Sequence, residues 1–312
     1  MKIVITGALG HIGSRLLRDL PFSFPGCEIL MIDNLLTQRY CSLFNLPKEG
    51  KYRFIEGDIT KIDLNPHLQD AYVLIHLAAI TDAAGSFDKR QEVENNNFKA
   101  TQKVAEACIK GSTRLIALSS TSIYGTQKKL VSEECALDEL KPQSPYAECK
   151  LKEEQLVTRL SKEQGLQSIT CRFGTIYGDS PGMRFHTAVN KFCWQAAMGQ
   201  PITVWRTAYN QKRPYLDLGD ASNAIIHIIR KDIFDGQIYN VLTQNATVRE
   251  IVDIIRIYVP TLEVQFVDNQ IMNQLSYEVS NARFHSTGFE TTKKLSETLK
   301  RQLELLPTGL SG

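Results

Sequence analysis

The 312-residue sequence has no long apolar run, no long basic run, no internal repeat and no low-complexity segment. An apolar run of about 20 residues is what a membrane-spanning helix requires. The formal net charge is only +2, so no basic surface of the kind that binds nucleic acid is indicated. We therefore expect neither a membrane nor a nucleic acid among the partners.

The seven cysteines include no CxxC pair and form an odd total. Several lie in apolar patterns, which is typical of reduced, buried thiols in a cytosol. The six histidines show no metal-ligand spacing, so we expect no metal site, and His76 is interpreted as a core histidine. Because the first residues already form a predicted strand, we expect no signal peptide and a cytoplasmic location.

Short apolar strands alternate with helical patterns through the first 175 residues. The predicted strands are Lys2–Thr6, Glu28–Ile32, Tyr52–Glu56, Tyr72–Leu77, Arg114–Ser119 and Ser168–Phe173. The helices between them include Gly13–Leu20, Phe87–Lys110 and Pro145–Gln164. This alternation predicts an α/β fold with a parallel sheet covered by helices on both faces.

After Tyr177 the pattern changes to shorter elements separated by glycine, proline and asparagine. We interpret this part as a smaller C-terminal α/β lobe that covers one edge of the sheet, where substrates bind in such folds. The division predicted is 1–175 for a cofactor-binding domain and 176–312 for a substrate lobe. Some segments, such as the helix Asp220–Lys231, are expected to return to the first domain.

Three glycines, Gly7, Gly10 and Gly13, follow the first strand and open the first helix. Gly7 permits the tight turn, Gly10 lets the backbone approach a pyrophosphate, and Gly13 lets helix and strand pack closely. The helix N-terminus then faces the phosphates with its unpaired N–H groups. This context favours a Rossmann-type, doubly wound dinucleotide-binding sheet, although an ordinary strand–turn–helix would use glycine as well.

Asp33 ends the second strand about 20 residues after the last glycine, where such folds bind the adenosine ribose hydroxyls. Its carboxylate would repel a 2′-phosphate, so NAD is favoured over NADP. Because Arg39 follows closely and could pair with a 2′-phosphate, NADP remains the alternative cofactor.

Tyr146 and Lys150 lie one helical turn apart at the start of a predicted helix. A phenol that removes a hydroxyl proton at neutral pH must be acidified by roughly three pKa units, or about 4 kcal/mol. One cation at about 4 Å supplies about that energy at an effective dielectric near 20. We predict that Lys150 and an oxidised nicotinamide ring together lower the pKa of Tyr146, and that Ser120 holds the substrate oxygen. The alternative is that Tyr146 and Lys150 are ordinary surface residues.

With these residues the chain resembles the extended short-chain dehydrogenase/reductase family, in its NAD-dependent sugar-nucleotide epimerase/dehydratase branch. It is similar there to UDP-glucose 4-epimerase-like proteins. The resemblance covers residues 1 to about 220 and rests on the segments Thr6–Gly13, Asp33–Asn34, Gly57–Ile59, His76–Ala79, Asn97 with Thr101, Ser119–Gly125, Pro145–Lys150, Arg172–Gly178 and Lys212–Asp220.

The resemblance implies that NAD is bound by Gly7, Gly10, His11, Ile12, Gly13, Asp33, Asn34, Asp58, Ile59, Leu77, Ala78, Ala79, Asn97, Ser119, Tyr146 and Lys150. It implies that Ser120, Tyr146 and Lys150 are catalytic. It assigns the nucleotide-sugar substrate to Thr121, Ser122, Thr175, Arg184 and Arg213, with His186 as a further candidate. An arginine suits a diphosphate because its planar fork pairs with two phosphate oxygens.

Within this branch, the 4,6-dehydratases carry an Asp-Glu pair for water loss where this chain has Thr121 and Ser122. Uronate decarboxylases have a glutamate in place of Ser122, and 3,5-epimerising reductases add a cysteine and a histidine near the same strand end. Cys149 is interpreted as a packed thiol. We therefore favour 4-epimerisation through a 4-keto intermediate. Thr175 replaces the asparagine of many epimerases, so the sequence does not identify the sugar of the substrate.

Two other functions remain open from the sequence. One is a keto-sugar-nucleotide reductase or dehydrogenase with an exchangeable cofactor, and the other is a non-catalytic dinucleotide-binding regulatory protein. The helices Phe87–Lys110 and Pro145–Gln164 resemble the pair that forms a four-helix bundle in family dimers, so we expect a homodimer.

Overall fold

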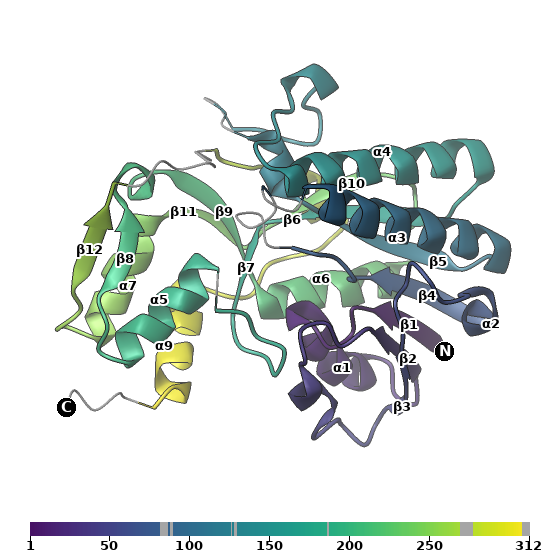
Figure 1. Ribbon diagram of the computed structural model, residues 1–312, viewed down its shortest axis with the longest axis horizontal. Coiled ribbons are helices and arrows are strands. Elements are labelled where there is room, and N and C mark those ends of the chain that lie inside the picture. Colours follow the sequence, from purple (N-terminus) through teal and green to yellow (C-terminus); the bar gives the residue numbers. More distant parts are fainter. Residues whose placement is uncertain are drawn as a thin grey trace.

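The computed structural model describes residues 1–81, 87, 90–125, 127, 130–185, 187–268 and 277–307 (Figure 1). Its largest sheet is parallel, with seven strands in the order β10-β6-β5-β4-β1-β2-β3. The strands are β1 (Lys2–Thr6), β2 (Glu28–Asp33), β3 (Lys51–Glu56), β4 (Ala71–His76), β5 (Arg114–Ser120), β6 (Ser168–Phe173) and β10 (Ile238–Val241). The predicted α/β class and the six predicted strands are confirmed. The strand order reverses between β1 and β4, which creates a crevice at their carboxyl ends.

Helices cover both faces of this sheet (Figure 1). On one face lie α1 (His11–Ser23) and α6 (Leu218–Lys231), whose residues Leu16, Leu17 and Ile225 share one buried cluster with the sheet. On the other face α3 (Arg90–Gly111) and α4 (Pro145–Gln164) lie side by side, and Val104 and Leu156 belong to a second cluster. The short helix α2 (Asn65–Leu68) joins the second group.

The second half of the chain contributes to the large sheet, which the sequence indicated only in part. The sequence assigned no strand beyond Ser168–Phe173 to this sheet, whereas the structure adds β10 beside β6. A four-residue strand that follows a helix leaves little periodicity to detect. Helix α6 also packs on the first domain, so the division at residue 175 stays a prediction.

A smaller lobe holds two further sheets. One has the order β11-β9-β7 and the other pairs β12 with β8. Its elements are β7 (Thr175–Tyr177), α5 (Ala188–Ala197), β8 (Ile202–Trp205), β9 (Lys212–Asp217), β11 (Gln244–Thr247), α7 (Val248–Tyr258), β12 (Val264–Val267) and α9 (Leu295–Leu305). Helix α8 (Ala282–His285) instead packs against β10, and its Phe284 belongs to the core of the large sheet. Helices α5, α7 and α9 enclose a core that includes Tyr177, Phe192 and Ile251. Within the described ranges, no helix has both the length and the apolar content needed to cross a membrane.

Candidate functional site

At Gly7 and Gly13, on either side of the turn between β1 and α1, there is no room for a side chain. Gly7 has φ +66°, and a Cβ there would lie 2.6 Å from the Ala78 nitrogen at the end of β4. A Cβ on Gly13 would lie 2.4 Å from the Ala8 carbonyl oxygen. Gly10 is the N-cap of α1 and supplies no side-chain cap, so N–H groups of the first turn remain for a ligand.

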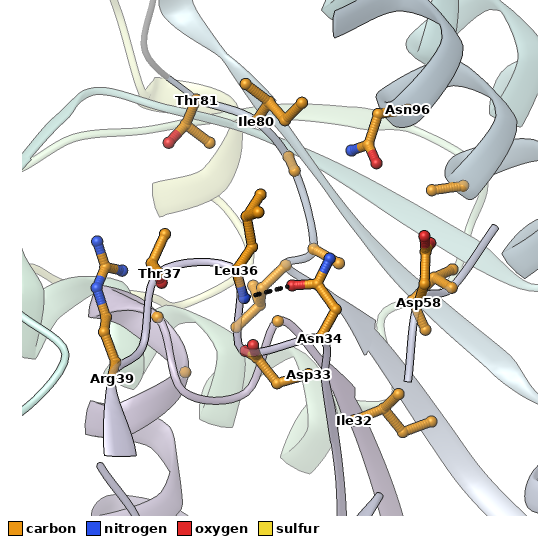
Figure 2. A pocket seen from close by; sticks show the side chains of 18 of the residues that line it. Ile32, Asp33, Asn34, Leu36, Thr37, Arg39, Asp58, Ile80, Thr81 and Asn96 are labelled. Carbon is orange, nitrogen blue, oxygen red and sulfur yellow. Dashed lines mark hydrogen bonds between the residues drawn. The ribbon is translucent and has the colours of Figure 1, made fainter. Parts of the chain in front are cut away.

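This turn borders a cavity of about 460 Å³ at the crevice, which is large enough for a cofactor (Figure 2). Twelve of the sixteen residues predicted to bind NAD line it: Gly7, Gly10, His11, Ile12, Gly13, Asp33, Asn34, Asp58, Ile59, Leu77, Ala78 and Ala79. Asp33 at the end of β2 accepts backbone hydrogen bonds from Leu9 and Leu35, each at 3.0 Å. The glycine motif and the acidic residue therefore meet at one cavity, as the sequence predicted.

Several lining residues carry no motif that could have identified them. They are Ile32, Leu36, Thr37, Thr60, Ile80, Thr81, Asn96 and Ala100, whereas the lining residues Arg39, Gly57 and Arg184 were named from the sequence. Figure 2 shows Asp33 at the end of β2 and Asn34 and Arg39 on the chain that follows it. Burial lowers the pKa of Arg39, and the charge of Asp33 opposes that shift. A cation thus lies beside the predicted ribose-binding carboxylate.

Asn97 is close to this cavity but does not line it. Its side chain accepts a hydrogen bond from the Ile80 nitrogen at 2.8 Å and donates one to the Ile80 oxygen at 2.9 Å. Asn97 therefore fixes the chain after β4 to α3, while its neighbour Asn96 faces the cavity. Its predicted direct contact with a cofactor stays a prediction.

The segment 178–184 after β7 is fastened to the glycine-rich turn. His11 Nε2 lies 2.9 Å from the Gly178 oxygen, and the Ser180 hydroxyl donates to the His11 oxygen at 2.9 Å. Burial lowers the pKa of His11 to about 4, so the imidazole is neutral at pH 7 and donates to Gly178. The Gly182 nitrogen donates to Ser14 Oγ at 3.0 Å. These contacts carry Arg184 to the cavity, where it donates to Thr81 Oγ1.

Replacing Gly182 with alanine tests this junction. A Cβ at this position would lie 2.3 Å from the Leu9 oxygen and 2.5 Å from the Gly10 oxygen, so the glycine-rich turn must shift. We expect a loss of about 1–3 kcal/mol in the free energy of unfolding and weaker NAD binding, measured by denaturant titration and calorimetry. Gly199→Ala is the control for NAD binding. Its φ of +64° makes an added Cβ cost stability, but no atom lies within 4 Å of that Cβ, so NAD binding should be unchanged. NAD binding unchanged in Gly182→Ala would contradict this role.

Tyr146 and Lys150 begin α4, as predicted. Ser144 caps the helix by accepting from the Ala147 nitrogen at 3.2 Å. The Lys150 ammonium lies 6.0 Å from the centre of the Tyr146 ring. The positive charge of Arg184, which lines the large cavity, acts on the Tyr146 phenol and lowers its pKa. Neither Tyr146 nor Lys150 is among the residues that line the glycine-rich cavity, and Arg184 is the lining residue that acts on the phenol.

The acidity expected for Tyr146 with a bound nicotinamide ring stays a prediction, and the structure shows what opposes it within the chain. Burial raises the pKa of the Tyr146 phenol above its usual value, while the Lys150 ammonium and the Arg184 guanidinium lower it only in part. After burial, the second contribution that raises this pKa is the charge of Glu153, because Lys150 is not an isolated cation. Its Nζ is paired with Glu153 Oε2 at 2.9 Å, and both side chains are buried. The sequence reasoning took no account of this carboxylate.

The end of β5 places Ser120 and Ser122 together, in the turn of η2 (Thr121–Tyr124). Ser120 Oγ accepts from the Ser122 nitrogen at 3.2 Å and from the Ser122 hydroxyl at 2.9 Å. Among the described residues it donates to none, so its hydrogen can be donated to a substrate oxygen. Thr121 is buried and donates to the Phe173 oxygen at 3.3 Å. Ser119 instead faces a second, much smaller cavity with His76.

The remaining predicted substrate residues lie in two places. Thr175 on β7 and Arg213 on β9 belong to the three-stranded sheet, and burial raises the pKa of Tyr277 and Tyr215 while the charge of Arg213 opposes that shift. Arg184 instead lines the large cavity. His186 lies outside the described residues. Within the described ranges no group of three or more histidine, cysteine or acidic side chains is arranged to hold a metal ion.

Comparison with known proteins identifies the relatives of this arrangement. A family model described as the NAD dependent epimerase/dehydratase family matches residues 3–241. An uncharacterized UDP-glucose epimerase of Bacillus subtilis, YtcB, is 30% identical over 264 residues, which cover 82% of this chain and 81% of that protein.

A trifunctional UDP-glucose 4,6-dehydratase/UDP-4-keto-6-deoxy-D-glucose 3,5-epimerase/UDP-4-keto-L-rhamnose-reductase of Arabidopsis thaliana is 29% identical over 319 residues. That match covers 97% of this chain, but this chain spans only 46% of the plant enzyme's length.

Solved structures match over nearly the full length. A mutant UDP-glucuronic acid 4-epimerase from Bacillus cereus, in complex with UDP-4-deoxy-4-fluoro-glucuronic acid and NAD, aligns with a TM-score of 0.89 at 25% identity, covering 98% of this chain and 99% of that one. MoeE5 in complex with UDP-glucose and NAD aligns with a TM-score of 0.83 at 26% identity, covering 97% and 98%. The sheet and its flanking helices are therefore those of nucleotide-sugar enzymes.

Proposed function

The chain belongs to the NAD dependent epimerase/dehydratase family, and we propose that it is an NAD-dependent nucleotide-sugar 4-epimerase with Tyr146 as its acid–base group. One observation carries the proposal: at the start of α4 the Lys150 ammonium lies 6.0 Å from the centre of the Tyr146 ring, and Arg184, which lines the glycine-rich cavity, acts electrostatically on the same phenol. With NAD bound in that cavity, Tyr146 would exchange the proton of a substrate hydroxyl while the hydrogen on the adjacent carbon is transferred to the cofactor.

The cavity suits NAD in shape and charge. The closely packed glycines leave room for a pyrophosphate at the start of α1. Asp33 offers carboxylate oxygens to ribose hydroxyls and disfavours a 2′-phosphate. Because Arg39 also lines the cavity, NADP is the alternative cofactor to test. Bound there, NAD supplies a hydride acceptor that can return the hydride to the substrate.

The residues of the chain supply the proton chemistry. Ser120, with its hydrogen available, would hold the reacting oxygen, and Tyr146 would take up and return its proton. Lys150 would stabilise the phenolate electrostatically. Arg213 and Arg184 are the cations proposed to bind the diphosphate of the substrate, with Thr121, Ser122 and Thr175 as proposed sugar contacts. Relatives carry UDP-sugars in their names, which makes these the first substrates to test.

Water elimination is disfavoured because the chain lacks the carboxylates it requires. At the end of β5 the side chains are Thr121 and Ser122. Glu153 is a carboxylate close to Tyr146, but its Oε2 accepts from Lys150 and Thr101, and its Oε1 accepts from Cys149. Both of its oxygens are therefore engaged by donors within the protein. This favours 4-epimerisation over the dehydratase reaction that several relatives are named for.

Turnover without added cofactor tests the proposal. Purified protein, saturated with NAD and then desalted, should convert a UDP-sugar into its 4-epimer with no net change at the absorbance band of reduced nicotinamide. A thermal-shift screen of sugar nucleotides in the presence of NAD selects the substrate. Stoichiometric consumption of NADH would instead identify a reductase, and binding of NAD without any turnover would identify a regulatory protein.

We also propose a homodimer that pairs through α3 and α4. The support is that these two long helices lie side by side on one face of the sheet (Figure 1). Their exposed side chains include the ion pairs Arg90–Glu148 and Lys152–Glu94, so such an interface would be polar and weakened by salt. Light scattering should give twice the chain mass at micromolar concentration, decreasing at high salt. A monomer at low salt would contradict the dimer.

We propose a cytoplasmic location, supported by the state of the cysteines. All seven are free, and five are buried: Cys27, Cys108, Cys149, Cys171 and Cys193. Burial raises the pKa of Cys149 to about 12, which keeps it an unreactive thiol and agrees with its interpretation as a packed side chain.

A further inference from the structure

A buried carboxylate lies directly behind the Tyr146–Lys150 pair. Glu153, three residues after Lys150 on α4, is 5% exposed. Its Oε2 lies 2.9 Å from the Lys150 ammonium and accepts from the Thr101 hydroxyl of α3 at 2.8 Å. Its Oε1 accepts from the Cys149 thiol at 3.4 Å. Every partner within hydrogen-bond reach is thus a donor, as an ionised carboxylate requires.

Little solvent screens this ion pair. Glu153 also borders the second cavity, of about 10 Å³, together with His76 of β4 and Ser119 of β5. That volume holds about one water molecule. His76 Nε2 and Ser119 Oγ are buried there without a hydrogen-bond partner among the described residues. The charges of Lys150 and Glu153 therefore act on their neighbours at low effective dielectric.

The other titratable groups near Glu153 are neutral or separately paired. Burial lowers the pKa of His76 to about 4, so it is uncharged at neutral pH. Glu154, the next residue, is paired with Arg172 of β6. The charged groups that act on Tyr146 are therefore Lys150, Glu153 and Arg184, the last of which lines the glycine-rich cavity.

We propose that Glu153 is a positioning residue that holds Lys150 in place and sets the pH at which Tyr146 becomes a base. This inference rests on the proposed function only for its kinetic consequence. No motif of the sequence pointed to Glu153, and it acts through Lys150 without touching a substrate.

The direction of the effect follows from charge balance. With Tyr146 protonated, Lys150 positive and Glu153 negative, the cluster of these three groups is neutral, and loss of one proton leaves it with a net negative charge. Without the carboxylate charge the same cluster begins positive and loses its first proton more readily. Because Tyr146 and Lys150 are coupled, this holds whichever of the two releases the proton. Glu153 thus raises the pH at which the base forms.

The variant Glu153→Gln tests the inference, since it removes the charge and preserves the size. We expect the rising limb of kcat/KM against pH to move to lower pH by about one to two units, the usual size of the effect of one nearby buried unit charge at an effective dielectric near 20. Glu153→Asp should keep the limb close to that of the wild type. The matched control is Glu148→Gln on the same helix, where the carboxylate is 37% exposed and pairs with Arg90. It should leave the limb unmoved.

Two readings need no turnover and so separate this inference from the proposed function. The first is the ultraviolet titration of the phenolate in the NAD-bound protein, with Tyr146→Phe subtracted to isolate the Tyr146 signal. It should move to lower pH in Glu153→Gln. An unmoved titration in a folded, NAD-binding variant would overturn the inference, even if the enzyme proves to be an epimerase.

The second reading uses the wild type, in case Glu153→Gln does not fold. Carbon-13 NMR of side-chain-labelled glutamates, assigned by difference from Glu153→Asp, reports the ionisation of the Glu153 carboxyl group. A carboxylate that stays ionised from pH 6 to 9 supports the inference, and one that stays protonated overturns it.

Discussion

Tyr146→Phe is expected to reduce kcat by about 100- to 10,000-fold, the usual contribution of a general acid–base group. The phenol is the group proposed to exchange the substrate proton, and phenylalanine keeps the ring while removing the proton carrier. None of the hydrogen bonds in the described part of the chain uses the Tyr146 hydroxyl, so the fold should be retained. Turnover is measured by product formation, and NAD binding by calorimetry.

The matched control for this prediction is Tyr72→Phe. The Tyr72 hydroxyl lies on β4 and donates to Asp232 at 2.8 Å, an exposed contact outside the cavity-lining residues. It should turn over at close to the wild-type rate. If Tyr146→Phe retained full activity with NAD bound, Tyr146 would not be the acid–base group, and a binding or regulatory function would be favoured.

The second large effect concerns stability. Glu154→Gln is expected to lower the free energy of unfolding by about 3–5 kcal/mol, because it leaves the Arg172 guanidinium buried without its counter-ion. Arg172 donates to Glu154 twice, from Nε at 2.9 Å and from Nη2 at 2.8 Å, and to the Tyr124 hydroxyl at 2.8 Å. The pair joins α4 to β6 and the turn after β5. It therefore holds the helix that carries Tyr146.

Glu148→Gln is again the control, since an exposed ion pair contributes about 0–1 kcal/mol. Both variants are compared by denaturant titration. If the two lost the same small amount of stability, the Arg172–Glu154 pair would not anchor α4, and the position of Tyr146 would have to be fixed by apolar packing alone.

The parts of the fold that could be predicted are those whose sequence patterns are local. The six strands from Lys2–Thr6 to Ser168–Phe173 were predicted because buried parallel strands form continuous apolar runs. The strand β10 was missed because its place in the sheet depends on α6 returning across the face of α1, a contact between distant parts of the chain. Short strands of that kind are defined by their neighbours.

The residues of the site likewise fall into those that a local motif identifies and those that only contacts between distant parts of the chain define. Gly7, Gly13 and Asp33 were recognised because their spacing along the chain determines their chemistry, and the structure brings them to one cavity. The acidity of Tyr146 could be predicted only in part, because it also depends on burial and on Glu153, neither of which the motif contains. The attachment of segment 178–184 to the glycine-rich turn was missed for the same reason, since it joins residues about 170 positions apart.

The fate of the hydrogen at carbon 4 of the sugar tests the central claim most directly. A UDP-sugar deuterated at that carbon is incubated with NAD-saturated, desalted protein, and the products are examined by NMR and mass spectrometry. Proposed 4-epimerisation predicts a 4-epimer that retains the deuterium at carbon 4, with no reduced nicotinamide accumulating. A 4-keto-6-deoxy product, or release of the label with net oxidation or reduction, would contradict it.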